Sequence, residues 1–347
     1  MHMADALLSP AVGATLWTGT LGAIAYCTRK LRNNIDEKII PLMGILGAFI
    51  FAAQMINFTI PGTGSSGHIG GGMLLAILLG PYAGFITIAS VLIIQSLFFA
   101  DGGILALGCN IWNLGIYPCF IAYPLIFKLL VKEDLSKSRI TLASVMSVVT
   151  ALQLGAFSVV VETLLSGRSE LPFGAFTAMM LPIHLAIGLV EGFITAGVVN
   201  YVRSARPEII KSTFDSKPLA PAVSIRKVVL TLGIAALITG GSLSWFASTH
   251  PDGLEWSVEK VHGSPELSSS ETGITAMFEK IQTMTALLPD YGFRQEEGAE
   301  GTAGAKSWPA VNSGTSISGV IGSLMVLGTV LLIGLFIRSG NRSRAKG

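Results

Sequence analysis

Charged residues are scarce in this sequence. Asp, Glu, Lys and Arg make up 13% of the 347 residues, whereas 51% are hydrophobic, and the mean hydropathy is +0.64. A soluble domain carries roughly a quarter of its residues as charged side chains to keep its surface hydrated. The shortage excludes a water-covered surface over most of the protein and predicts an integral membrane protein in contact with lipid.

Several catalytic and binding signatures are also missing. The cysteines Cys27, Cys109 and Cys119 show neither CxxC nor CxxxC spacing, which argues against a disulfide framework. There is no HExxH sequence and no nucleophile motif with a partner histidine, so an intramembrane enzyme has no support. Residues 298–307, the nearest approach to a phosphate-binding loop, lack GxxxxGKS/T spacing, so no nucleotide site is expected in this chain.

Long apolar runs are abundant instead. A hydrocarbon core of ~30 Å needs about 20 apolar helical residues. The runs of suitable length are 11–28, 40–58, 83–99, 106–127, 140–165, 175–202, 226–247 and 319–337. A shorter run, 69–80, ends at Gly80-Pro81 and predicts a short or broken helix packed inside protein. The sequence thus predicts an all-α polytopic membrane protein with a compact bundle of about seven helices and a C-terminal two-helix hairpin.

Positive charge predicts the orientation of these helices. Of the 23 Lys and Arg residues, 18 fall in residues 29–39, 128–139, 203–227 and the C-terminal tail. With nine crossings, all four segments lie on one side of the membrane, which is the cytoplasmic side for basic loops. The N-terminus is then outside, the C-terminus is inside, and residues 248–318 form a long extracytoplasmic loop.

The chain divides into two expected domains. Residues 1–205 form the membrane bundle, residues 206–225 a cytoplasmic linker, and residues 226–347 the hairpin with its outer loop. That loop carries ten acidic and four basic residues and shows little periodicity, so we expect little regular structure in it. No internal repeat is visible, which disfavours a secondary transporter built from inverted repeats.

The N-terminus offers a metal chelate. No basic residue precedes Arg29, so the positive region of a secretory signal is missing, and Met1 and His2 are expected to stay on the protein. The terminal amine, the His2 amide nitrogen and the His2 imidazole Nδ1 can close two fused rings on one metal ion. Three nitrogens in a plane leave a fourth position open, and square-planar nitrogen coordination suits Ni(II) and Cu(II).

A second imidazole is expected at the same face. His68 follows the Gly/Ser-rich stretch 62–67, on a loop that the topology places outside with the N-terminus. Glycines there permit close backbone approach. Ser65 and Ser66 are expected to orient the His68 ring through hydrogen bonds. His2 and His68 together predict a metal site.

These features coincide with a family resemblance. The matching stretches are MH at 1–2, QMINF at 54–58, SGH at 66–68, LGP at 79–81, QSLFF at 95–99, DGG at 101–103, LGCN at 107–110 and HLAIGLVEG at 184–192. In these stretches the chain resembles CbiM/NikM proteins, the substrate-capturing subunits of energy-coupling-factor transporters for cobalt and nickel. The segment PDGLEW at 251–256, just outside a predicted span, resembles the small N component, so the chain looks like a fused protein.

The resemblance implies ligands and partners. In the family the metal is held by groups that correspond here to Met1, His2 and His68. The partners it implies are a transmembrane T component and two cytoplasmic ATPases in a prokaryotic inner membrane, with no role for nucleic acid. Ni(II) and Co(II) both remain open as substrate.

Further polar residues within or beside apolar segments are candidates for function. His184 and Glu191 share a helix face and are candidate functional groups within the membrane, either for metal passage or as structural hydrogen-bond partners. Asn110 is expected to support the His68 loop. Asp252 and Glu255 are expected to help load or close the metal site.

Three classes of protein are considered for this sequence. The first is the metal-capturing subunit of an ATP-driven importer, which the paired histidines and the resemblance favour. The second is a self-sufficient secondary transporter of another small solute, which predicts transport without ATPases. The third is an intramembrane enzyme, which lacks the motifs it needs; the sequence predicts that the protein is not an enzyme.

Overall fold

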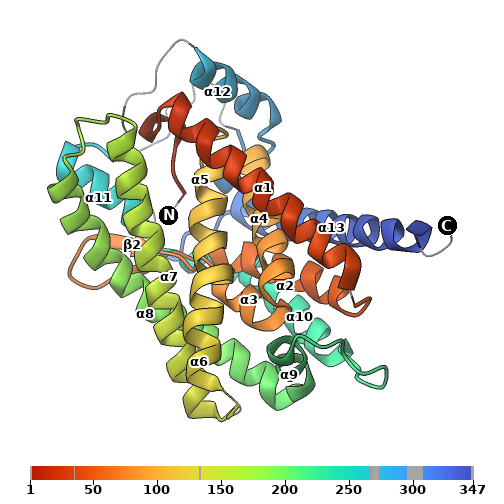
Figure 1. The fold of residues 1–347 in the computed structure, drawn as a ribbon. Coiled ribbons are helices and arrows are strands. Elements are labelled where there is room, and N and C mark those ends of the chain that lie inside the picture. The colour runs from red at the N-terminus through yellow and green to blue at the C-terminus, as the bar shows by residue number, and fades with distance from the viewer. Residues whose placement is uncertain are drawn as a thin grey trace.

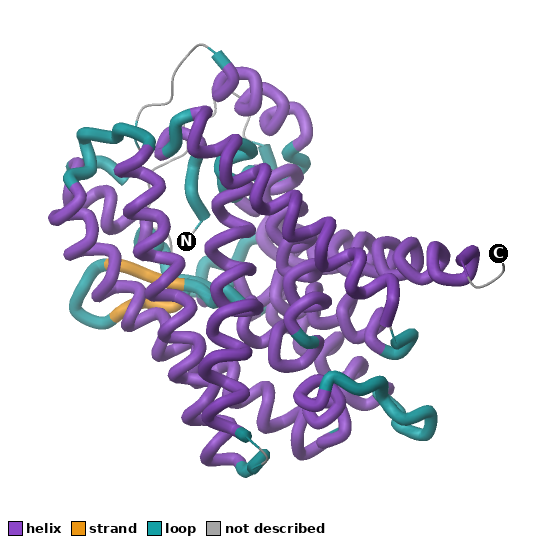
Figure 2. Tube along the Cα trace, in the orientation of Figure 1, coloured by secondary structure: helices purple, strands orange, loops and turns teal. Residues whose placement is uncertain are grey.

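A computed structural model of the chain describes residues 2–34, 36–132, 134–265, 267, 273–294 and 308–344. Within these residues the protein is predominantly helical, and its only strands form one two-stranded hairpin (Figure 2). The all-α architecture predicted from the sequence is therefore confirmed.

The N-terminal part is a helical bundle that is followed by one short helix, α9. Its elements in order are η1 (Asp5–Leu7), α1 (Pro10–Asn34), α2 (Ile39–Gln54), β1 (Phe58–Ile60), β2 (Ser65–Gly67), α3 (Gly72–Leu79), α4 (Pro81–Phe99), α5 (Leu107–Ile111), the π-helical η2 (Trp112–Phe127), α6 (Lys128–Val131), α7 (Lys137–Leu165), α8 (Phe173–Ala205) and α9 (Pro207–Asp215). Helices α7 and α8 pack along each other, and η2 packs against α7 (Figure 1).

The C-terminal part is a helical hairpin with elements between its arms. It comprises α10 (Arg226–Gly241), η3 (Leu243–Phe246), α11 (Gly253–His262), α12 (Ile274–Thr285), η4 (Pro289–Tyr291) and α13 (Ser313–Arg344). Helices α10 and α13 pack against each other and both pack on α2. The hairpin is therefore joined to the bundle by direct helix contacts as well as by the linker.

Five helices in the described residues are long and apolar enough to cross a membrane: 81–99, 107–131, 137–165, 173–205 and 313–339. Helix α2 is apolar but shorter. The other predicted crossings correspond to α1, α3 and α10, which are shorter or less apolar than those five. The multi-pass architecture is established, whereas nine crossings remain a prediction.

The short helix α3 is buried along its whole length, as the sequence predicted for residues 69–80. It ends at Leu79; the next residue, Gly80, adopts φ +83°, and Pro81 occupies the first turn of α4. Proline has no N–H to donate and fits the first turn of a helix, so the chain turns sharply there. The turn lets α3 pack back against α4 inside the bundle.

The outer loop is more ordered than expected. Residues 248–318 contain α11 and α12, although the sequence suggested little regular structure there. The signal that was missed is a capping box: Asp252 accepts from the N–H groups of Leu254 and Glu255, and Glu255 accepts from the N–H of Asp252. The two stretches of this loop with the least sequence periodicity are 263–273 and 296–307. Most of both lies outside the described residues, which omit 266, 268–272 and 295–307.

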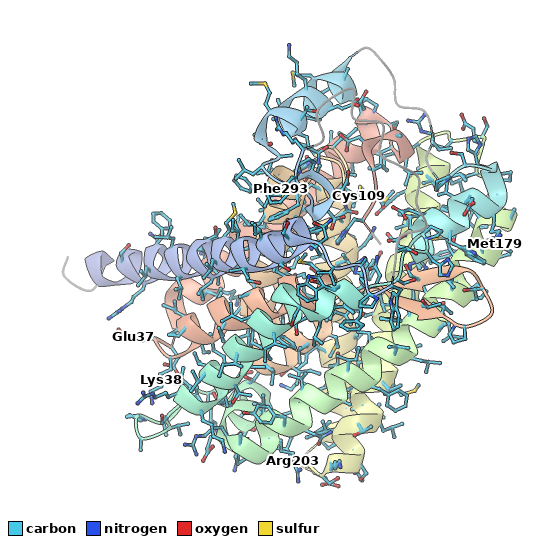
Figure 3. All side chains as sticks on the ribbon, turned by 180° about the vertical axis from the view of Figure 1, so that it is seen from behind. Glu37, Lys38, Cys109, Met179, Arg203 and Phe293 are labelled. Atoms are coloured by element: carbon cyan, nitrogen blue, oxygen red, sulfur yellow. The ribbon has the colours of Figure 1, made fainter. Side chains whose placement is uncertain are left out.

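The two ends of the bundle differ in what they carry. In Figure 1, α6 and α9 lie at the lower end, whereas α11 and α12 lie at the left and top. Figure 3, seen from behind, shows Lys38 and Arg203 in the lower half and Met179 and Phe293 in the upper half. The basic segments around Lys38, Arg203 and α6 therefore gather away from the acidic segment that contains α11 and α12.

Candidate metal centre

The N-terminal residues run from η1 into the interior of the molecule (Figure 1). Asn110 on α5 holds them: its Oδ1 accepts from the Met3 N–H at 2.8 Å, and its Nδ2 donates to the Met3 carbonyl at 3.2 Å. The N–H of Gly103 donates to the same carbonyl at 3.0 Å. These bonds fix the main chain next to His2.

The turn after α4 packs closely against this N-terminal segment. A Cβ atom at Gly103 would lie 1.8 Å from Oδ1 of Asp5, so no side chain fits there. Asp5 in turn accepts from the N–H of Ala106 at 2.9 Å. Ala100, which precedes the turn, adopts φ +56°, and this left-handed residue directs Asp101 toward His2. The DGG stretch at 101–103 thus lets two chain segments lie against each other.

The His68 loop approaches from the opposite side. It follows the β1–β2 hairpin, in which Phe58 pairs with Gly67. Glu191 on α8 accepts from the N–H groups of Gly70 and Gly71, at 2.8 Å each. Gln54 on α2 donates to the Gly70 carbonyl at 2.9 Å.

The two predicted imidazoles meet. The ring centroids of His2 and His68 lie 5.1 Å apart with an interplanar angle of 40°, and the two side chains are 6% and 10% exposed. Nδ1 of His68 lies 3.0 Å from the Ile69 carbonyl, an acceptor, so this nitrogen carries the proton and Nε2 presents its lone pair.

His2 is held differently. Its Nδ1 lies 2.7 Å from Oδ1 of Asp101, and within the described residues its Nε2 is buried with no hydrogen-bond partner. Buried nitrogens are normally satisfied, so one left open beside a second imidazole indicates a site for a ligand.

Burial controls the charge states of these groups. Burial is the main cause that lowers the pKa of His68, to about 3, and the neighbouring His2 acts in the same direction, so His68 is a neutral imidazole at physiological pH. For Asp101, burial acts to raise the pKa, but the charge and hydrogen bond of His2 and the hydrogen bond of Tyr291 outweigh it and hold the pKa well below its usual range. Burial and the charge of Asp101 raise the pKa of Tyr291, which keeps its hydroxyl protonated.

The C-terminal part closes one side of the site. Asp252 caps α11 with one carboxylate oxygen, and its other oxygen lies 3.8 Å from Nε2 of His68. The N–H of Ser66 donates to the Pro251 carbonyl at 2.8 Å, and the Ser66 hydroxyl donates to the His250 carbonyl at 2.8 Å. The serine therefore holds the chain that carries Asp252.

Gly253 explains how α11 comes so close to the bundle. A Cβ atom there would lie 2.8 Å from Ile187 and 3.3 Å from the ring of His184, both on α8. His184 donates from Nδ1 to the Met180 carbonyl at 2.8 Å. His184 thus packs against the start of α11 and lines a small cavity together with His68 and Asp252.

A cavity of about 500 Å³ opens above the two imidazoles. No Lys or Arg is present among its described lining residues, which include six carboxylates. These are Asp5, Asp101, Asp252, Glu255, Glu279 and Asp290. A cavity lining rich in carboxylates raises the local concentration of cations.

The predicted site residues are thus distributed as follows. His2, His68 and Asp252 come together, and Glu255 lines the cavity above them, whereas Met1 lies outside the described residues. Asn110 contacts the N-terminal segment rather than the His68 loop.

The remaining predicted residues support the surroundings of the site. The Ser65 hydroxyl donates to the Ser66 carbonyl at 3.1 Å, so both serines bond main-chain carbonyls, and Glu191 bonds the main chain just after His68. Sequence reasoning missed Asp101 and Tyr291 as site residues. The DGG stretch was a signal for the former.

Within the described residues no three His, Cys, Asp or Glu side chains converge in an arrangement for a metal ion. Asp101 and Asp252 each lie beside one imidazole, but among the described side chains they do not complete a three-ligand arrangement with both. A metal ion bound here needs donors beyond the two imidazoles.

These features define a multi-pass membrane protein with a buried polar site built from its N-terminus, a glycine-rich hairpin and a C-terminal loop segment. The CbiM family model, described as the cobalt uptake substrate-specific transmembrane region, matches residues 2–209, and the PDGLE domain model matches residues 226–339. The chain belongs to the CbiM family and carries a PDGLE domain after it.

Relatives share this arrangement over nearly their whole length. The chain is 34% identical over 333 residues to a protein named putative fused nickel transport protein NikMN of Archaeoglobus fulgidus, covering 94% of this chain and 96% of that protein. It is 30% identical to the fused nickel transport protein NikMN of Rhodobacter capsulatus, with coverages of 84% and 88%. A crystal structure described as a truncated transition metal transporter is 32% identical and superposes with a TM-score of 0.52, over 59% of this chain and 99% of that one.

Proposed function

We propose that this protein captures a divalent nickel or cobalt ion at its outer face for import. The observation that carries the proposal is the meeting of the His2 and His68 imidazoles in one buried site. The carboxylate-lined cavity above them supports it, because the cavity favours entry of a cation. The nickel transport names of the relatives support the choice of metal.

The coordination we propose is a planar set of nitrogens. The terminal amine of Met1, the amide nitrogen and Nδ1 of His2, and Nε2 of His68 supply four donors. In the structure Nδ1 of His2 bonds to Asp101, so chelation requires the imidazole to exchange this carboxylate for the metal. A square-planar nitrogen set favours Ni(II) over Co(II), Zn(II) and Mg(II).

The proposed assembly places the cavity outside the cell. The basic segments around Lys38, α6 and α9 lie away from α11 and α12, which supports an outer N-terminus and a cytoplasmic C-terminus. The energy then comes from partners, a transmembrane T component and two ATPases, because this sequence has no phosphate-binding loop. Residues 1–205 form the metal-binding domain, 206–225 the linker, and 226–347 the N-component-like domain.

The chelate is tested by metal titration of the full chain with its native N-terminus, purified in detergent. One tightly bound Ni(II) with the d–d absorption band of a planar nitrogen site is expected. Inserting one glycine before His2 breaks the fused rings and is expected to abolish the band and the tight binding. Equal binding and equal spectra in both proteins would overturn the site. Binding in both without the planar band would assign the metal to the Nε2 atoms of the two imidazoles.

Dependence on partners distinguishes an importer subunit from a secondary transporter. Radioactive nickel uptake is measured in cells that express the chain alone or with a T component and its ATPases. Uptake only with active ATPases supports the proposal. Full uptake by the chain alone, which persists with inactive ATPases, would establish a secondary transporter.

A further inference from the structure

A chain of hydrogen bonds joins His2 to the C-terminal part of the protein. One oxygen of Asp101 bonds Nδ1 of His2 at 2.7 Å, and the other accepts from the Tyr291 hydroxyl at 2.5 Å. Tyr291 belongs to η4, which follows α12 in the segment covered by the PDGLE domain match. Both oxygens of this partly buried carboxylate are thus occupied, one by each part of the protein.

The same tyrosine connects onward to the His68 loop. Gln95 Nε2 lies 3.3 Å from the Tyr291 hydroxyl and donates to Oε1 of Gln54 at 2.9 Å. Gln54 donates to the carbonyl of Gly70, two residues after His68. Tyr291 is therefore the point at which the two candidate ligands are connected through side chains.

Tyr291 is held firmly in this position. Its ring stacks on Phe99 with a centroid distance of 5.2 Å and an interplanar angle of 19°, and it lies edge-on to Phe51 at 6.1 Å. Its backbone adopts φ +58°, a left-handed conformation that is uncommon for residues other than glycine. Such strain persists only where the surrounding contacts hold it in place.

The neighbouring C-terminal residues bind the turn that carries Asp101. Gln282 donates to the carbonyls of Ser96 and Gly102, at 2.9 and 2.7 Å. The N–H groups of Leu287 and Leu288 both donate to the Phe98 carbonyl, at 2.9 and 3.2 Å. The segment 282–291 therefore fixes this turn on both sides of Asp101.

We infer that Tyr291 is a positioning residue for the metal site: by fixing Asp101 it holds the His2 ring beside His68 until the metal displaces this carboxylate, and through Gln95 and Gln54 it holds the His68 loop. The inference rests on the proposed function. A carboxylate with a single partner can rotate, whereas Asp101 is fixed by partners on both oxygens. Groups that hold metal ligands in place change metal affinity roughly 10–100-fold when removed. The C-terminal part thereby completes the site in the bundle.

The test is a double-mutant cycle on the full chain with its native N-terminus, read by Ni(II) titration and visible absorption. Tyr291→Phe is expected to raise the Kd roughly tenfold and to shift or broaden the d–d band. Tyr117→Phe is the matched control, because it also removes a hydrogen-bonded tyrosine hydroxyl, in this case one that donates to Ser158. Its Kd is expected to change less than twofold.

The cycle is completed with Asp101→Asn. If Tyr291 acts through Asp101, adding Tyr291→Phe to Asp101→Asn costs much less affinity than it costs in the native protein. Fully additive losses, or an unchanged Kd and spectrum in Tyr291→Phe, overturn the inference. The unaltered protein reports separately on the proposed function, since a native chain that binds no Ni(II) contradicts that function itself.

A measurement on the unaltered protein covers the case in which Tyr291→Phe does not fold. Hydrogen exchange is compared with and without Ni(II). The amides of Leu287, Leu288 and Gly103 are expected to slow together when the metal binds, because one hydrogen-bonded network holds them. Unchanged exchange at Leu287 and Leu288 beside slowed exchange at Gly103 overturns the inference.

Discussion

The carboxylate of Glu191 lies 2.8 Å from the main-chain N–H of Gly70, two residues after His68. A second oxygen of the same carboxylate accepts from Gly71. A carboxylate buried within a membrane helix is costly unless it is satisfied, and two N–H donors satisfy it here. The contact connects the middle of α8 to the loop that carries a candidate metal ligand.

The contact between Glu191 and the loop after His68 predicts that a substitution at Glu191 lowers metal affinity, although Glu191 is not a proposed ligand. Glu191→Gln places an amide group against one of the two N–H donors and leaves that donor unsatisfied, at a cost of roughly 1–3 kcal/mol. We expect Ni(II) affinity to fall about tenfold while the protein remains monodisperse. Glu162→Gln is the control, since Glu162 is also buried in a membrane helix but bonds Asn113 and Ser158. Equal losses in both variants would indicate a general effect on the bundle.

The imidazole of His68 is predicted to be essential for binding. His68→Gln removes Nε2 from the site, and we expect tight Ni(II) binding to disappear in calorimetric titration. His262→Ala, which removes an exposed histidine at the end of α11, is expected to bind like the native chain. Tight binding retained in His68→Gln would move the metal elsewhere.

The lowered pKa of His68 predicts a pH dependence of stability. In the folded protein this pKa is about 3, below the unfolded value of 6.5. Below pH 6.5 the unfolded chain therefore binds a proton that the folded chain does not, and the folded state loses stability as the pH falls toward 3. Between pH 7 and pH 5 the thermal midpoint of the native protein is expected to fall more than that of His68→Gln. Equal decreases in the two proteins would contradict the assignment.

Asp252 is predicted to assist metal entry through its charge. Asn is also a good helix N-cap, so Asp252→Asn preserves the start of α11 while it removes the negative charge 3.8 Å from His68. We expect the Ni(II) association rate to fall several-fold, with a weaker dependence on salt. Glu259→Gln on the same helix, outside the described cavity lining, is the control for loss of one charge. A rate unchanged in Asp252→Asn would leave Asp252 as a cap alone.

Much of the architecture was predictable from the sequence because a segment that crosses lipid must be apolar and must satisfy its own backbone hydrogen bonds. Apolar runs form helices, and the break at Gly80-Pro81 predicted the buried α3. The order within the outer loop was not predicted, although Asp252 and Glu255 carry a capping box that is visible in the sequence. The amphipathic α12 lies in the same loop.

The sequence by itself determined the membrane class, the helices and the pair of histidines, since composition, hydrophobic runs and residue types are local properties of the chain. Only the tertiary structure decided that Asp101 joins His2 to Tyr291 and that Glu191 holds the loop after His68. Those contacts link segments far apart in the chain. Their geometry depends on helix packing and on two left-handed residues, Ala100 and Tyr291, whose conformation no local pattern encodes.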